Sequence, residues 1–145
     1  MDIYSVLDGE LISLEQVEDP VFSERMLGDG IGILPASDEL CSPIDGIITM
    51  IFPTKHAIGI KGVEGTELLI HIGIDTVELK GKPFTALAKI GARVSVEEPL
   101  MKVDFGLIRD KGYDVTTFVL VTNRKIRIKK KMGKIKVGDF ILETI

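Results

Sequence analysis

The sequence has no tryptophan, a single cysteine and few aromatic residues, six Phe and two Tyr in a chain of 145. With only Cys41 available, neither an internal disulfide nor a zinc cluster built on thiolates can form, and such cysteine usage is typical of a reducing compartment. The scarcity of large aromatic side chains leaves Leu, Ile and Val to fill the core.

Long apolar runs are absent as well. The longest, residues 118–121, contains four residues, far fewer than a bilayer-spanning helix needs. The first ten residues, MDIYSVLDGE, lack the basic start and apolar centre of a signal peptide. We therefore expect a soluble, cytoplasmic protein. Its length and its 45% apolar and 28% charged composition predict one globular domain over residues 1–145.

The charge is unevenly distributed along the chain. The net charge is −4, yet residues 124–136 (RKIRIKKKMGKIK) hold 8 of the 18 basic residues and no acidic one, so the remainder carries 10 − 22 = −12. An acidic body disfavours nucleic acid and favours a basic protein partner. The basic run could bind phosphate, but the isoleucines among its lysines favour a solvated, charged strand edge and turn.

Short β-rich runs separated by glycine-containing turns dominate the pattern. The predicted strands are residues 44–52, 56–61, 67–74, 99–103, 117–121 and 140–142. Helical turns are predicted only at residues 20–26 and 106–112, and the glycines at 28 and 30 are expected to form a tight connection. The fold class is therefore all-β, an antiparallel sandwich or barrel with one or two short helical turns.

Two weak internal repeats indicate a duplicated β motif. Residues 5–14 (SVLDGELISL) match residues 42–51 (SPIDGIITMI) at an offset of 37, with Ser, Asp and Gly identical. Alternating positions of residues 94–100 match residues 135–141 at an offset of 41. Two copies are too few for a solenoid, so the repeats predict a duplicated motif that closes on itself.

The only two histidines, His56 and His71, lie in predicted strands separated by a turn that contains Gly62 and Gly65. A hairpin through this turn places the two histidines opposite each other to within one residue, which makes their rings cross-strand neighbours. A single histidine among aliphatic residues is more often a core group, but two facing titratable rings indicate a shared role.

Several chemistries lack the motif that they need. A zinc hydrolase needs a third ligand besides the histidines, for which Asp29 or Asp75 could serve, but no His-x-His or His-Glu-x-x-His pattern exists. There is also no Gly-x-Ser-x-Gly elbow and no phosphate-binding glycine loop. A remaining option is a histidine as covalent nucleophile toward a phosphoryl group, with the second histidine and Thr54 stabilising the phosphoryl oxygens.

At these residues the chain closely resembles the glucose-type enzyme IIA domain of the bacterial phosphoenolpyruvate-dependent sugar phosphotransferase system. The matching stretches are residues 19–31, 42–46, 52–58, 67–81, 84–87, 104–105 and 117–123. The most specific of these is the run HIGIDTV at residues 71–77. The resemblance implies a β-sandwich of duplicated hybrid motifs, in agreement with the repeats.

The resemblance also implies a function as phosphocarrier. His71 would accept a phosphoryl group from the carrier HPr and pass it to a cysteine of a sugar-permease enzyme IIB domain. His56 would be its partner, supported by the Thr54 hydroxyl. The implied docking face consists of Phe22, Met26, Phe52 and Leu69, with Asp19 and Asp75 at its acidic rim. Regulatory protein partners are known in the family. No cofactor is expected; zinc could bridge the two histidines but is not required.

Two other functions are weighed against this one. A lipoyl- or biotinyl-type carrier would share the strand-turn-strand pattern of residues 94–100 and 135–141, but it needs a Met-Lys-Met tip that the sequence lacks. A zinc peptidase of the lysostaphin type has a similar fold, but it needs a His-x-His pair, and Gly73 stands where the second histidine would be.

Overall fold

The computed structural model describes residues 1–145 and consists mainly of antiparallel β-strands. The strands are β1 (Asp2–Tyr4), β2 (Gly9–Ser13), β3 (Asp29–Pro35), β4 (Glu39–Cys41), β5 (Gly46–Ile51), β6 (Ala57–Gly62), β7 (Glu67–Ile72), β8 (Phe84–Ala86), β9 (Arg93–Val94), β10 (Pro99–Val103), β11 (Thr117–Val121), β12 (Ile126–Ile128), β13 (Gly133–Ile135) and β14 (Phe140–Thr144). The helices are α1 (Pro20–Ser23) and α2 (Phe105–Asp110), with 3-10 turns η1 (Leu14–Gln16) and η2 (Thr76–Leu79).

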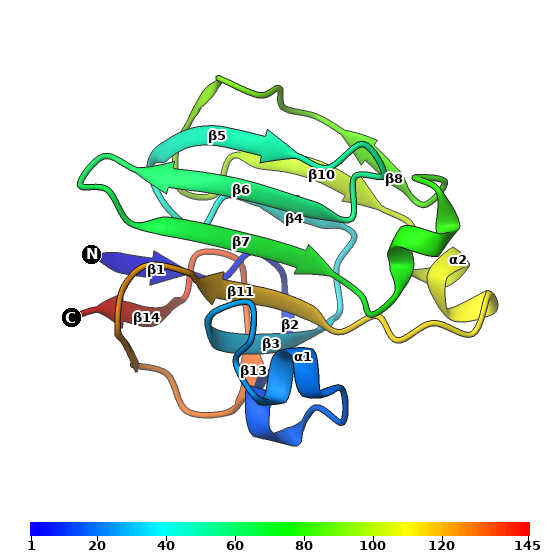
Figure 1. The fold of residues 1–145 in the computed structure, drawn as a ribbon, viewed down its shortest axis with the longest axis horizontal. Helices are drawn as coiled ribbons and strands as arrows, with labels where there is room; N and C mark the ends of the chain where they lie inside the picture. Colours follow the sequence, from blue (N-terminus) through cyan, green and yellow to red (C-terminus); the bar gives the residue numbers. More distant parts are fainter.

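The strands form three open sheets. The largest has the order β13-β2-β3-β11-β7-β6-β5-β9, and the smaller ones are β4-β10-β8 and β1-β14-β12. In Figure 1, β5, β6, β7 and β11 form a front layer with β4 and β10 behind it, and the two termini lie side by side. No sheet closes on itself, so of the two all-β forms expected, the sandwich is the one observed.

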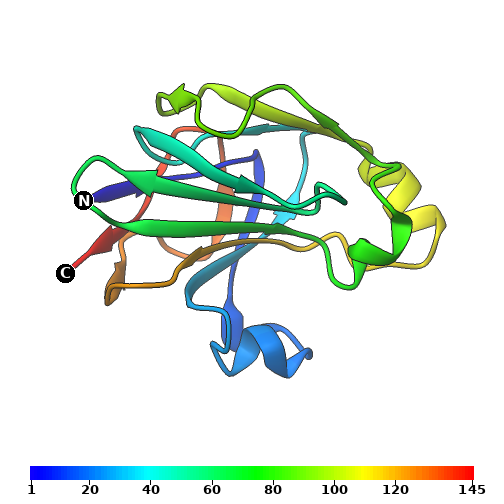
Figure 2. The ribbon, with the colours of Figure 1, turned by 45° about the horizontal axis from the view of Figure 1, so that its top comes forward.

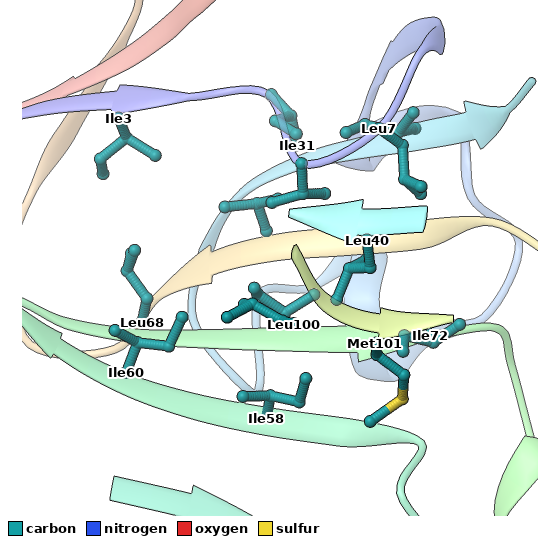
Figure 3. Packing of buried hydrophobic residues seen from close by; sticks show 14 of the residues in the cluster. Ile3, Leu7, Ile31, Leu40, Ile58, Ile60, Leu68, Ile72, Leu100 and Met101 are labelled. Atoms are coloured by element: carbon teal, nitrogen blue, oxygen red, sulfur yellow. The ribbon is translucent and has the colours of Figure 1, made fainter. Parts of the chain in front are cut away.

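Alternation along each strand sends every second side chain into the core between the layers. On β7, Leu68, Ile70 and Ile72 are buried there, together with Ile58 and Ile60 of β6. Figure 3 shows the labelled side chains of β6 and β7 packing toward Leu40 of β4 and Leu100 and Met101 of β10. The intervening β7 residues, among them His71, therefore point to the opposite face of the sheet.

That opposite face carries a second, smaller apolar cluster. It consists of Leu14, Val17, Phe22, Phe118 and Leu120. These residues come from η1 and the residue that follows it, from α1 and from β11, and Figure 2 shows α1 projecting from this side of the molecule. Part of the sheet face that carries His71 is therefore covered by η1 and α1, and the rest is exposed.

The internal repeats correspond to structurally equivalent elements. Ser5 and Ser42, which open the first pair of repeats, are fully buried, and each hydroxyl donates to the carbonyl two residues later at 2.7 Å. Asp8 and Asp45 each accept a backbone N–H from the second pair, at 2.8 and 2.9 Å. Each copy of the first repeat therefore pairs with one copy of the second, which confirms the predicted duplication.

The longest strand, β3, is not among the predicted strands. Only Gly28 belongs to the expected tight connection, because the strand already begins at Asp29. Gly30 weakens the β pattern, yet the structure requires it, since a Cβ atom there would overlap the carbonyl of Val119 on β11. The close approach of two strands therefore explains a residue that local propensity disfavours.

The basic run and the two α-helices lie where the pattern predicted them, whereas the 3-10 turns η1 and η2 lie outside the predicted helical ranges. β12 and β13, within residues 124–136, are edge strands of their sheets, which confirms the interpretation as a charged strand edge. Helix α1 begins after Asp19, whose carboxylate accepts the Val21 N–H at 2.9 Å, and Asp104 caps α2 in the same way. Neither helix has the length or apolar character that crossing a bilayer requires.

Candidate functional site

The site lies where the start of β6 meets the end of β7, at one end of the large sheet (Figure 1). Ala57 pairs with His71, and the backbone carbonyl of His56, one residue earlier, accepts the Ile72 N–H at 2.7 Å. The predicted register is therefore correct to within one residue. Lys55 adopts a left-handed conformation (φ 60°) just before the strand begins. The two imidazole rings end as neighbours, with centroids 5.2 Å apart and planes at 78°.

The proton on the His71 ring is located by its hydrogen bond. Its Nδ1 lies 2.8 Å from the carbonyl oxygen of Gly73. Because a carbonyl oxygen only accepts, Nδ1 must carry the proton and donate it, and Nε2 keeps its lone pair. This bond depends on a turn in which Gly73 has φ +75°, a conformation that favours glycine.

The His56 ring is fixed through the corresponding nitrogen. Its Nδ1 lies 2.7 Å from the hydroxyl oxygen of Thr54, and the edge of the ring meets Phe52 with centroids 5.2 Å apart. His56 is buried. Since both Nδ1 atoms are engaged locally, the Nε2 atoms are the nitrogens left free for chemistry.

Burial lowers the pKa of both histidines. For His71, desolvation and then the neighbouring positive charge of His56 lower the pKa to about 4, opposed in part by the Gly73 carbonyl and Asp19. For His56, desolvation lowers the pKa. His71 is therefore neutral at pH 7, which keeps the Nε2 lone pair available for attack.

This depressed pKa predicts acid sensitivity of the fold. The unfolded chain binds a proton at His71 near pH 6.5, whereas the native protein does so only near pH 4. The free energy of unfolding should therefore fall as the pH drops from 6.5 to 4, by at most about 3 kcal/mol from this residue. Chemical denaturation at several pH values checks this. His71→Gln should lack that part of the pH dependence, and identical pH profiles in the two proteins would contradict it.

Two phenylalanine rings, Phe22 and Phe118, pack against the His71 ring. Phe22 stacks on Phe118 with centroids 3.8 Å apart and planes at 5°, and it meets His71 edge-on at 5.1 Å. Phe118 lies directly opposite His71 on β11. Phe22 is only 3% exposed. It therefore lies beneath the expected docking face and is not one of its surface residues.

The remaining predicted residues surround the two rings in different ways. Asp19 and Asp75 line a hollow of about 130 Å³ together with both histidines. Phe52 and Leu69 are half-buried, and Met26 is exposed. No group of three or more His, Cys, Asp or Glu side chains is placed to hold a metal ion, so the ligand set of a zinc hydrolase is not assembled.

The structure adds residues that the sequence analysis did not select. Leu27 and Val77 are exposed apolar side chains that line the same hollow. Met50 pairs with Gly59, and Gly59 pairs with Leu69, so these three residues form a row across β5, β6 and β7. Strand alternation could have predicted the row of Met50, Gly59 and Leu69. Leu27 and Val77 reach the hollow only through the turns that carry them, which alternation does not predict. The open face therefore has a wider apolar surface than predicted.

Comparison with known proteins gives consistent matches. The family described as "phosphoenolpyruvate-dependent sugar phosphotransferase system, EIIA 1" matches residues 1–126. The chain is 42% identical over 146 residues to a "PTS system glucose-specific EIIA component" of Halalkalibacterium halodurans, covering 99% of this chain and 84% of that protein. The solved glucose permease IIA from Mycoplasma capricolum superimposes with a TM-score of 0.92 at 38% identity, covering 98% of this chain and 94% of that one.

Longer proteins match over the same region. The chain is 42% identical over 142 residues to a "PTS system glucose-specific EIICBA component" of Staphylococcus carnosus, covering 97% of this chain and 21% of that protein. A "PTS system glucoside-specific EIICBA component" of the same organism is 46% identical over 143 residues, with 20% of its length covered. The chain thus spans about a fifth of the length of these relatives.

Proposed function

Since this chain belongs to the phosphoenolpyruvate-dependent sugar phosphotransferase system EIIA 1 family, we propose that it is a phosphocarrier that bears its phosphoryl group on His71. The phosphoryl donor is the phosphohistidine of HPr. The acceptor is a cysteine on the enzyme IIB domain of a glucose-family sugar permease. The relatives named EIICBA support a IIB-type acceptor.

The observation that carries this proposal is the hydrogen bond from His71 Nδ1 to the Gly73 carbonyl, which leaves Nε2 free. In the first step, the Nε2 lone pair attacks phosphorus and a new N–P bond forms. The N–P bond of phospho-HPr breaks, and its electron pair stays on the HPr imidazole. In the second step, a IIB thiolate attacks the same phosphorus and an S–P bond forms, while the N–P bond to His71 breaks and its electron pair stays on Nε2.

The neighbouring groups suit stabilisation of the transferring group. When the Thr54 hydroxyl donates to His56 Nδ1, the proton of the His56 ring lies on Nε2, and Nε2–H can donate to a phosphoryl oxygen. Charge develops on those oxygens during transfer, so a preorganised donor lowers the barrier. No step requires a cofactor or a bridging zinc, since every bond made or broken joins phosphorus to a side chain of this protein or a partner.

Charge and apolar surface support docking of basic partners at this face. The chain outside residues 124–136 has a balance of −12, and Asp19 and Asp75 flank the histidines. Such complementarity speeds encounter, while an apolar centre prolongs the complex. Leu69 lies two residues from His71 on the same face of β7 and is a central candidate for that contact.

Leu69→Asp is therefore expected to slow phosphoryl transfer from HPr by about 30-fold, since truncating a central interface residue typically costs about 2 kcal/mol. Val63→Asp is the matched control, because Val63 is 80% exposed in the β6–β7 turn at the far end of the hairpin. Stopped-flow transfer rates, with thermal melts to verify folding, test this. Equal rates for the folded Leu69 variant and the control would show that the docking face is assigned wrongly.

Mass spectrometry tests the function directly. We expect the intact protein to gain one phosphoryl group when incubated with phosphoenolpyruvate, enzyme I and HPr. The modification should be acid-labile and should map to the peptide that contains His71, because phosphohistidine hydrolyses in acid. Absence of any gain, or modification of the His56 peptide alone, would contradict the proposal.

A further inference from the structure

The Gly73 peptide is held by the segment that precedes β11. The Gly73 N–H donates to the Thr116 carbonyl at 2.9 Å, and the Ile74 N–H donates to the Asp114 carbonyl at 3.1 Å. Pairing between these two parts of the chain therefore continues beyond Ile72, the last residue of β7. The turn that presents a carbonyl to His71 is consequently not free to rotate as a loop.

The Asp114 side chain fixes this supporting segment in turn. One carboxylate oxygen, Oδ1, accepts both the backbone N–H of Thr116 at 2.8 Å and the Thr116 hydroxyl at 2.6 Å. Thr116 is only 3% exposed, so both of its donors are satisfied inside the protein.

Thr76 confines Gly73 from the other side. Its hydroxyl donates to the Ile72 carbonyl, and a Cβ atom at Gly73 would overlap its methyl group. The Asp114 carbonyl would lie 2.9 Å from the same Cβ atom. Held between Thr76 and Asp114, the Gly73 peptide directs its carbonyl at His71 Nδ1.

We propose that Asp114 and Thr116 are positioning residues for His71, which hold the Gly73 carbonyl in place and thereby keep the lone pair on Nε2. This inference rests on the proposed function only in taking His71 as the nucleophile. The two residues act through hydrogen bonds and not through charge, since the carboxylate that raises the pKa of His71 is that of Asp19. Asp114→Asn, which keeps an accepting Oδ1, should therefore preserve most of the effect.

The first test measures the proton on the ring and needs no phosphate. The ¹⁵N shifts of the His71 imidazole should report the Nδ1–H tautomer in the unsubstituted protein, and a mixture with Nε2–H in Asp114→Ala and Thr116→Val. Asp114→Asn should keep the Nδ1–H form. Asp45→Ala is the matched control, because Asp45 also accepts a backbone N–H, that of Val96 at 2.9 Å, outside this segment.

The second test measures phosphorylation by HPr. Asp114→Ala and Thr116→Val should each lower the maximal rate by about tenfold, in keeping with the loss of one or two hydrogen bonds, with KM for HPr unchanged. Asp114→Asn and Asp45→Ala should stay within about twofold of the unsubstituted protein. Thr116→Val retains the volume of the side chain and provides a variant that folds if Asp114→Ala does not.

The outcomes separate this inference from the proposed function. An unchanged His71 tautomer in folded Asp114→Ala and Thr116→Val would overturn the positioning role, as would an equal change in Asp45→Ala. An unsubstituted protein that HPr never phosphorylates would instead overturn the proposed function, because the tautomer is measured without any transfer.

Discussion

His71→Gln is expected to accept no phosphoryl group from HPr at all. The substitution removes the Nε2 lone pair that we propose makes the N–P bond, and losing a covalent nucleophile abolishes the intermediate. The other histidine does not replace it, since its Nδ1 contacts a hydroxyl at 2.7 Å instead of a carbonyl that fixes the tautomer. Transfer from isotopically labelled phospho-HPr, followed by intact-mass analysis, measures the result.

The glutamine variant must remain folded for this result to be meaningful. His71 lies between Ala57 and Phe118 on neighbouring strands, so an amide of similar size leaves the strand pairing in place. Near-identical far-ultraviolet circular dichroism and unchanged stability at pH 7.5 serve as the control. Any phosphoryl label on the folded variant would show that a residue other than His71 is the nucleophile.

His56→Gln is expected to separate the two transfer steps. The variant keeps His71 and should still become phosphorylated, but it should pass the group to a IIB domain about 10²–10³-fold more slowly. The reason is that one preorganised donor to the phosphoryl oxygens is lost while the nucleophile remains. The measurement is a chase of the labelled protein with an enzyme IIB domain, sampled by rapid quench.

The outcomes of this experiment are distinct. Normal transfer to the IIB domain would remove His56 from the mechanism, whereas a His56→Gln protein that HPr cannot label would reverse the roles of the two histidines. His71→Gln lacks the other ring, so comparing the two variants assigns a separate role to each histidine.

The proposed docking face shows which features the sequence could not predict. Leu69 could be placed beside His71 from alternation alone, since both lie on the same face of one strand. Phe22 could not, because only the packed structure stacks it on Phe118 and buries it beneath the histidine. Exposure depends on what covers a side chain, and residues distant in sequence provide that cover.

Short-range patterns in the sequence were enough to predict the strands that carry the two histidines. Alternation and glycine turns identified β6, β7 and β11, and the turn between the first two brought His56 and His71 together because register follows from turn position. The repeats predicted the duplicated motif because equivalent serines make equivalent local hydrogen bonds.

Contacts between distant parts of the chain fix which nitrogen of the His71 ring is free. The Gly73 carbonyl fixes the proton of His71, and that carbonyl is held by Asp114 and Thr116, about forty residues further along the chain. Position 30 of β3 likewise requires glycine because β11 approaches too closely for a side chain there. Such contacts have no local signature, because the chain brings these residues together only when the sheet has formed.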